Sequence, residues 1–238
     1  MFHKLNIINN IIFSSIIIAS IALCYSCEKN NCFSGSGKNS TQHIPLTTFS
    51  HIEIHGISNI LIIEDTANYA IINGGEHIID QTHVSQLDST INITNTTTCY
   101  MFKQYERPTI NIHTTHLKSI HINESCKLSN KGTISRDLSI YMNTKIADIN
   151  LHLNNNFTNF STYNKAGGIY TFSGTCTYAQ LHATYTASID ARKLQTRCLT
   201  VKNHSINDFH VWATDTLYTE TKKEGNILYI GNPIHIFL

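Results

Sequence analysis

A loose repeat runs through the C-terminal half of this chain and constrains its fold more than any other feature. Each repeat unit opens on a leucine or phenylalanine, and successive openings lie 21, 19, 24, 18 and 18 positions apart. The openings are Leu117, Leu138, Phe157, Leu181, Leu199 and Leu217. A unit of about 20 residues is too short to bury its own apolar face, so it has to stack on its neighbours.

Each unit consists of short stretches in which polar and apolar residues alternate, separated by small or polar turn residues. The segments 119–122 and 207–211 show this alternation. A period of two predicts strands, because successive side chains of a strand point to opposite faces. No segment beyond the first ~25 residues has a sustained helical period, so we expect no helix there. Repeated short strands of this kind favour an all-β, parallel β-helix-like solenoid over a sandwich or an up-and-down barrel.

The residues before the repeats predict further strands, so that one domain covers residues 44–238. Its first half is expected over 44–98 and its repeat half over 108–238. The strands of the first half are expected at 49–56, 59–63, 69–75 and 90–94, and the first and last of these stretches alternate. A polar connection follows, and Pro108 then opens the strand that leads into the repeats. Proline is tolerated there, because the first residue of a strand need not donate a backbone hydrogen bond.

The N-terminus predicts an export signal over residues 1–27. Lys4 supplies the positive start, and the apolar run that ends at Leu23 is shorter than the ~20 residues that span a bilayer. A small residue, Ser26, precedes Cys27, as at a bacterial lipoprotein cleavage site. We therefore expect Cys27 to become the lipidated first residue of the mature chain.

Other outcomes at this N-terminus are lipidation at Cys24, ordinary cleavage or a retained anchor. The segment that follows, 28–43, is rich in Asn, Ser and Gly and has no apolar period. Such a composition predicts a flexible tether between the lipid and the domain. A lipidated chain of this kind is expected on the outer membrane, facing the periplasm or the cell surface.

The charge content points away from nucleic acid as a partner. Charged residues make up 14% of the chain and the net charge is +1. Soluble domains typically contain ~25% charged residues. Binding to nucleic acid needs a clustered basic surface, and the longest basic run, Lys222-Lys223, is followed at once by Glu224. The surface is expected to be neutral and polar, which suits hydrogen-bonded ladders of Thr and Asn along stacked strands.

Two histidine-containing groups of residues are candidate metal sites. They are His51, Glu53 and His55 on one expected strand face, and His113, His116 and His121 near the start of the repeats. Neutral imidazoles at close spacing can bind zinc. Neither group has the tight ligand-pair spacing of a structural zinc site, so we interpret both as solvent-facing positions. We expect no metal ligand, no cofactor and no catalytic residue.

Four cysteines fall in the expected domain, at Cys99, Cys126, Cys176 and Cys198. An exported chain can form disulfides, and four cysteines allow three pairings. We favour buried thiols over a disulfide, because three of these residues lie in different repeat units and cysteine packs as a small apolar residue.

Three aspartates provide the argument for an enzyme. Asp148, Asp190 and Asp208 fall at similar places in successive repeats, and glycoside hydrolysis needs two carboxylates about 5 to 10 Å apart. The competing interpretation is that each terminates a turn by local hydrogen bonds. If the three were exposed together in one groove, a carbohydrate-active enzyme would be favoured.

The chain resembles the head GIN domain family of auto-transporter adhesins over residues 49–233. Four segments are similar to the family. They are Phe49-x-x-Ile52-x-Ile54-x-Gly56, Leu117–Ile120, Ser188–Leu194 and the closing Gly225-Asn226-Ile227-x-Tyr229-x-Gly231-Asn232-Pro233. The resemblance implies a right-handed β-helix-like solenoid in a bacterial envelope or secreted protein. The family's turn glycines are mostly absent here, so several turns are expected to be reshaped.

These observations predict a non-enzymatic, lipid-anchored envelope protein that presents a rigid β-solenoid for adhesion. Its partners would be the membrane, through the lipid, and a protein or glycan ligand. The alternatives are a carbohydrate-active enzyme that uses the stacked aspartates, and a structural or envelope-sensing lipoprotein of the periplasm.

Overall fold

The computed structural model describes residues 35–97, 106–143 and 145–237. Residues 36–97 and 106–237 form one compact all-β unit. The expected export signal, including Cys24 and Cys27, lies outside the described residues, as does Cys99. None of the described helices is long and apolar enough to cross a membrane.

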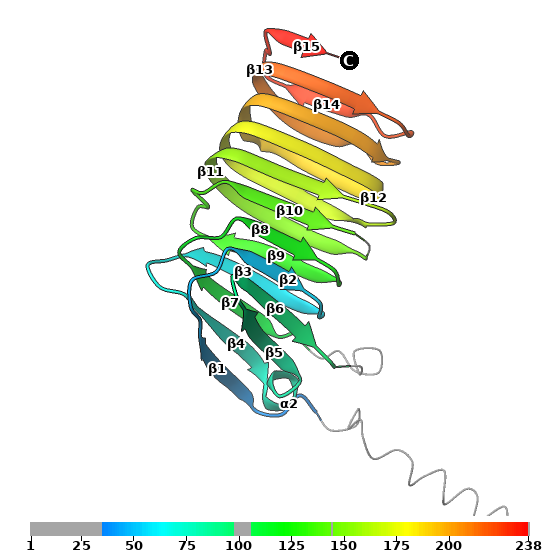
Figure 1. The fold of residues 1–238 in the computed structure, drawn as a ribbon. Helices are drawn as coiled ribbons and strands as arrows, with labels where there is room; N and C mark the ends of the chain where they lie inside the picture. The colour runs from blue at the N-terminus through cyan, green and yellow to red at the C-terminus, as the bar shows by residue number, and fades with distance from the viewer. Residues whose placement is uncertain (1–34, 98–105, 144, 238) are drawn as a thin grey trace, which may run out of the picture. The chain divides into compact units, whose positions relative to one another are not determined.

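The described residues form fifteen strands and one short helix, joined by turns and loops (Figure 1). The N-terminal half contains β1 (Asn39–Pro45), β2 (His51–Ile54), β3 (Ser58–Glu64), β4 (Tyr69–Gly75), α2 (Glu76–Ile79), β5 (Thr82–Leu87), β6 (Thr90–Asn95) and β7 (Thr109–Thr114). The repeat half contains β8 (Ser119–Ile122), β9 (Cys126–Lys131), β10 (Leu138–Met142), β11 (Ala147–Thr162), β12 (Gly167–Ser205), β13 (Phe209–Thr221), β14 (Ile227–Ile230) and β15 (His235–Phe237). The expectation of an all-β fold is confirmed.

The repeat half winds into stacked coils, each of which pairs in parallel with the next (Figure 1). Between β11 and β12 the register joins Ile149 to Tyr170, 21 positions later. Between β13 and β14 it joins Phe209 to Ile227, 18 positions later. The repeat seen in the sequence is therefore the spacing of hydrogen-bonded neighbours, and we call each unit a coil.

The coil length changes at one irregular place. Between β12 and β13 the register joins Ala191 to Val211, 20 positions later, and then Thr196 to Ala213, 17 positions later. A shift of this kind is typical of a β-bulge, in which unequal numbers of residues on the two strands oppose each other. The bulge explains why the later repeats are shorter.

The N-terminal half departs from a purely parallel stack. Strands β2 and β3 continue the stack in parallel with β8 and β9, but β1 with β4, β4 with β7 and β5 with β6 are antiparallel. The β5–β6 pair is a tight hairpin, because Leu87 pairs with Thr90 and only Asp88 and Ser89 lie between them. Asp88 has a φ of 51°, the left-handed conformation that a two-residue hairpin requires.

Strand β1 takes in residues 39–43, which the sequence placed in the flexible tether. Nearly every β1 side chain is exposed, so no alternation marks this strand. It forms because its backbone pairs with β4 from Asn39↔Gly75 to Pro45↔Tyr69. The prediction of no helix beyond the N-terminus was also wrong at α2, whose single turn buries Ile78 and Ile79 against the sheet.

The core follows from the period of two. Inward side chains of successive coils align in ladders, such as Ile52–Ile120–Ile140–Phe160–Leu181, and all five are at most 1% exposed. The ring of Phe160 also packs against two further aromatic rings, with centroid distances of 4.6 and 5.3 Å. Full burial of a side chain of this size contributes about 1.5–3 kcal/mol. The ladder leaves the alternate side chains of every coil pointing outward.

Two kinds of residue hold the left-handed backbone at the corners of the coils. Gly168 and Gly174 have φ of 133° and 101°, and a Cβ at either would meet a carbonyl oxygen of the preceding coil. Lys145, Asn164 and Tyr185 also have positive φ, of 82°, 54° and 63°. At these three positions a residue other than glycine holds the left-handed backbone and accepts the strain of a side chain there.

Candidate functional site

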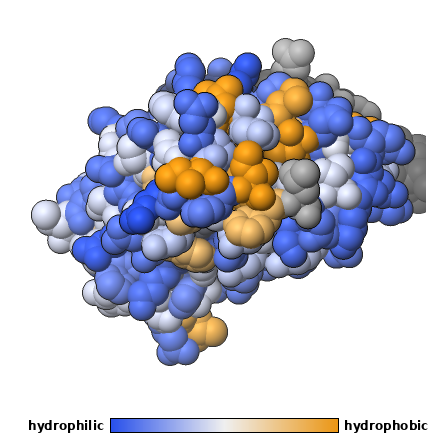
Figure 2. Space-filling view, turned by 90° about the horizontal axis from the view of Figure 1, so that it is seen from above, coloured by the Kyte–Doolittle hydropathy of each residue, from blue (hydrophilic) through white to orange (hydrophobic). Residues whose placement is uncertain are grey.

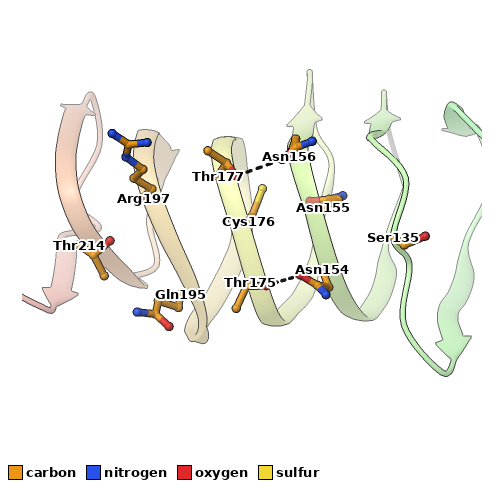
Figure 3. Close-up of a pocket in the computed structure, with 10 residues that line it drawn as sticks. All are labelled: Ser135, Asn154, Asn155, Asn156, Thr175, Cys176, Thr177, Gln195, Arg197 and Thr214. Carbon is orange, nitrogen blue, oxygen red and sulfur yellow. Dashed lines mark hydrogen bonds between the residues drawn. The ribbon is translucent and has the colours of Figure 1, made fainter.

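A shallow polar groove crosses the outer surface of several coils (Figure 3). It is an open depression of about 330 Å³, and we call it the polar groove. Its lining residues are Ser135, Asn154, Asn155, Asn156, Thr175, Cys176, Thr177, Gln195, Arg197 and Thr214. Amide and hydroxyl side chains dominate this lining.

Outward side chains of consecutive coils form two ladders in the groove. Figure 3 shows a first ladder of Asn154, Thr175 and Gln195 and a second ladder of Asn156, Thr177 and Arg197. Strand pairing places Asn154 beside Thr175 and Asn155 beside Cys176, so successive members lie one strand spacing apart, about 4.8 Å. The Oγ1 hydroxyls of Thr175 and Thr177 donate to the Oδ1 atoms of Asn154 and Asn156, at 2.7 and 3.3 Å.

The floor between the two ladders is buried and hydrogen-bonded. Asn155 is 8% exposed, and its Nδ2 donates to the backbone oxygen of Arg136 at 3.0 Å and lies 2.9 Å from the hydroxyl of Thr158. Cys176 is 4% exposed, and burial raises the pKa of its thiol. A thiol with a raised pKa is a poor nucleophile at neutral pH. The floor therefore supports the ladders and offers no reactive group.

Arg197 is the charged residue of the groove lining. Its side chain is 65% exposed, and its Nε lies 3.4 Å from Oδ2 of Asp215. Because the neighbouring carboxylate balances the guanidinium, the groove has little net charge. It is suited to hydrogen bonding with an uncharged ligand.

A second polar cluster lies on the outer face of the later coils. Nε2 of His182 lies 3.2 Å from Nδ1 of His204, whose Nε2 lies 2.9 Å from Oε1 of Glu220. Glu220 also pairs with Lys222 at 2.6 Å and Lys202 at 3.2 Å. The hydrogen bonds from Lys222, Lys202 and His204 lower the pKa of Glu220 to about 2. Burial, followed by the neighbouring His204, lowers the pKa of His182.

The structure does not bring the predicted histidine groups together as metal ligands. Nε2 of His55 pairs with Glu53 at 3.0 Å, whereas Nδ1 of His51 lies 2.7 Å from the hydroxyl of Ser119. Within residues 35–97, 106–143 and 145–237, no three His, Cys, Asp or Glu side chains are placed to hold a metal ion.

The histidines near the start of the repeats have separate surroundings. His113 pairs with Asp65 at 2.7 Å and stacks on Tyr69, with ring centroids 3.9 Å apart. His121 lies against Tyr141, with centroids 4.9 Å apart.

The three aspartates have different surroundings. The carboxylate of Asp190 accepts from Nε and Nη2 of Arg192 at 2.9 and 2.6 Å, and these bonds lower the pKa of Asp190. Asp208 accepts from the backbone and side-chain nitrogens of Asn226 at 2.7 and 3.1 Å. Asp148 stands beside Lys127 in the β9–β11 register. None of the three lines the polar groove.

Cys126, Cys176 and Cys198 are free thiols. Cys126 is 1% exposed, and burial raises the pKa of its thiol to about 12. Cys198 is half-buried, with its Sγ 4.0 Å from Oδ2 of Asp215.

The end of the stack formed by β14 and β15 carries exposed apolar side chains. Figure 2 looks onto this end and shows them gathered there. They are Leu228, Tyr229, Ile230, Ile234, Ile236 and Phe237, each 43 to 75% exposed. Both strands pair with β13, and no described strand or helix pairs with their other edges.

Sequence reasoning did not single out the polar groove. Its members are common residue types with no motif of their own. The signal was the repeat itself, because an offset of 21 places Asn154 beside Thr175 and Asn156 beside Thr177. Similarly, an offset of 22 would have brought His182 to His204.

Comparison with known proteins gives a family match and a shared fold. The family model described as "Putative auto-transporter adhesin, head GIN domain" matches residues 48–233. Among curated proteins, none matches this chain.

Solved structures share the fold at low identity. A "putative adhesin" of Bacteroides fragilis is 20% identical, with a TM-score of 0.76, over 84% of this chain and 92% of that one. A "putative adhesin" and a "putative lipid binding protein" of Parabacteroides distasonis are 12% and 14% identical, with TM-scores of 0.55 and 0.53. Each match covers 86% of this chain and 98% of the other.

Proposed function

Because the chain belongs to the head GIN domain family of auto-transporter adhesins, we propose that it is a lipid-anchored, non-enzymatic protein of the bacterial envelope that presents its stacked coils for adhesion. The observation that carries this proposal is the polar groove. Its outward amide and hydroxyl groups repeat from coil to coil, which suits contact with a ligand at several points along the stack. The aspartates that could have supported hydrolysis each have a local partner or neighbour instead.

The stack is proposed to be a right-handed parallel β-solenoid. Successive coils pair in parallel, and connections between parallel strands of one sheet are right-handed in about 98% of cases. The anchor is the lipid on Cys27, which becomes the first residue of the mature chain after cleavage between Ser26 and Cys27. The segment from 28 to the start of β1 is the tether, and the outer membrane is the site of attachment.

Metabolic labelling with palmitate tests the anchor. The full chain should incorporate label and the Cys27→Ala variant should not, while Cys24→Ala should label normally. Retention of label in Cys27→Ala, with loss in Cys24→Ala, would move the anchor to the other cysteine. Absence of label from all three proteins would rule out lipidation.

Two measurements on intact cells test adhesion. Protease added to the outside should cut the protein, and expressing cells should be retained on plates coated with mucin, which offers both glycan and protein. Cells that express an unrelated lipoprotein are the control. A protein that survives the protease and confers no retention is a structural or sensing lipoprotein of the periplasm, and the adhesion proposal is then wrong.

A further inference from the structure

We propose that the polar groove binds an uncharged linear polysaccharide that lies along the direction in which the coils stack. This assignment rests on the proposed adhesive function and names the ligand class of its site. Four features of the groove favour this ligand: the free hydrogen-bonding groups of the ladders, their spacing, their charge, and the pairing of the strands beneath them.

The ladders keep hydrogen-bonding capacity after their internal bonds are made. Oδ1 of Asn154 and Oδ1 of Asn156 accept from threonine hydroxyls, which leaves both Nδ2 amides without a side-chain partner among the described residues. The side-chain amide of Gln195 has no hydrogen-bond partner there either. Each amide nitrogen carries two donors. Sugar hydroxyls both donate and accept, so they match such a mixed surface.

The spacing suits a polymer of sugar rings. Neighbouring coils are about 4.8 Å apart, which is close to the length of one ring in an extended polysaccharide. Successive rings can then meet Asn154, Thr175 and Gln195 in turn. The volume of about 330 Å³ lies within the ~300–1,000 Å³ range of ligand sites, which limits the contact to a few rings.

The charge and the strand pairing favour this ligand over the alternatives. Arg197 is already paired with Asp215, so an acidic polymer finds no unbalanced cation in the groove. An extended peptide would bind by adding a strand to a free sheet edge. Both β11 and β12 have neighbours on each side, so the strands below the groove offer no such edge.

The structural interpretation of the ladders makes a different prediction. If the amides only stabilised the stack, their removal would change the free energy of unfolding and no binding constant. A matched control is available in Asn150 and Thr171, which pair in the same β11–β12 register outside the groove.

The test is calorimetric titration of the full chain, in a detergent without a sugar headgroup, with uncharged linear hexamers. The panel contains β-1,4-linked glucose, N-acetylglucosamine and mannose, and α-1,4-linked glucose, with hexagalacturonate as the acidic probe. At least one uncharged hexamer should bind, with an affinity that is insensitive to salt. The Asn156→Ala/Gln195→Ala variant should bind it about tenfold more weakly, and Asn150→Ala/Thr171→Ala should bind as the native protein does.

Three results would overturn the assignment. They are no binding of any uncharged hexamer at millimolar concentration, equal loss in the groove variant and its control, and tighter binding of hexagalacturonate. If cells are still retained on mucin in any of these cases, the ligand class is wrong and the adhesive function stands. Loss of both would reject the two proposals together.

Discussion

Replacing Tyr185 by glycine should make the protein more stable, although the change deletes a large side chain. Tyr185 has a φ of 63° at a corner of β12, and it is 51% exposed. A left-handed conformation costs a side chain of this kind about 1–2 kcal/mol. Glycine adopts that conformation freely but loses about 0.5–1 kcal/mol through its more flexible unfolded chain. The expected net gain is about 0.5–1 kcal/mol.

The hydrogen bonds at this corner survive the substitution, because they involve only the backbone oxygen of Tyr185. It accepts from the backbone nitrogen of Ile206 at 3.0 Å and from the hydroxyl of Ser205 at 3.1 Å. The gain should therefore not be offset by a lost bond. For a chain of this size, 1 kcal/mol corresponds to a rise in Tm of about 2–4 °C.

Tyr178 provides the matched control. It lies in the same strand and is also 51% exposed, but its φ is not positive. Tyr178→Gly should lower stability by about 1 kcal/mol, because glycine in a strand brings only its entropic cost and the loss of a favourable β residue. Urea unfolding followed by circular dichroism measures both variants, with the midpoint compared at an unchanged slope. If Tyr185→Gly and Tyr178→Gly lower the midpoint equally, the strain at Tyr185 is not real and the reasoning fails.

Three further predictions concern the stack. Gly174→Ala should destabilise the protein by about 3 kcal/mol in the same urea assay. The backbone of Gly174 has a φ of 101°, and a Cβ there would also meet the carbonyl oxygen of Leu153. An unchanged unfolding midpoint would refute this prediction. The pKa of His182 is lowered from 6.5, so this residue contributes stability above that pH that is lost as the pH falls through its folded pKa. Unfolding midpoints measured from pH 8 down to about pH 5 should fall less in His182→Gln than in the native protein, and parallel curves would contradict the linkage. Native-state labelling with a maleimide, mapped by mass spectrometry, should modify Cys198 faster than the buried Cys126, and equal rates would show that the core opens readily.

The sequence predicted what depends on a local period. Alternation along each unit marked the strands, and the repeat fixed the offset that joins Ile149 to Tyr170. Both signals come from burial of the inward face, which the core ladders require. The prediction of an all-β fold was correct for this reason.

The features that the sequence did not predict carry no local period or turn motif. Strand β1 is exposed on both faces, so only its backbone pairing with β4 makes it a strand. The β5–β6 hairpin turns on Asp88 and Ser89, which are less distinctive than the glycine-containing pairs usual in such turns. The polar groove combines outward residues of several coils, and the bulge after Ala191 shifts the offset just where Gln195 and Arg197 enter it.

The division of each coil into inward and outward positions has a consequence for how such proteins diverge. The Bacteroides fragilis structure keeps the fold at 20% identity, with a TM-score of 0.76. Outward residues such as Asn154 and Thr175 contribute little to the core, so they can be exchanged without disturbing the inward ladders. A duplicated coil would pair with its neighbours by the same backbone bonds and lengthen the surface by one strand spacing. The chemistry of the outer surface and its length can therefore change independently of each other, while the fold stays the same.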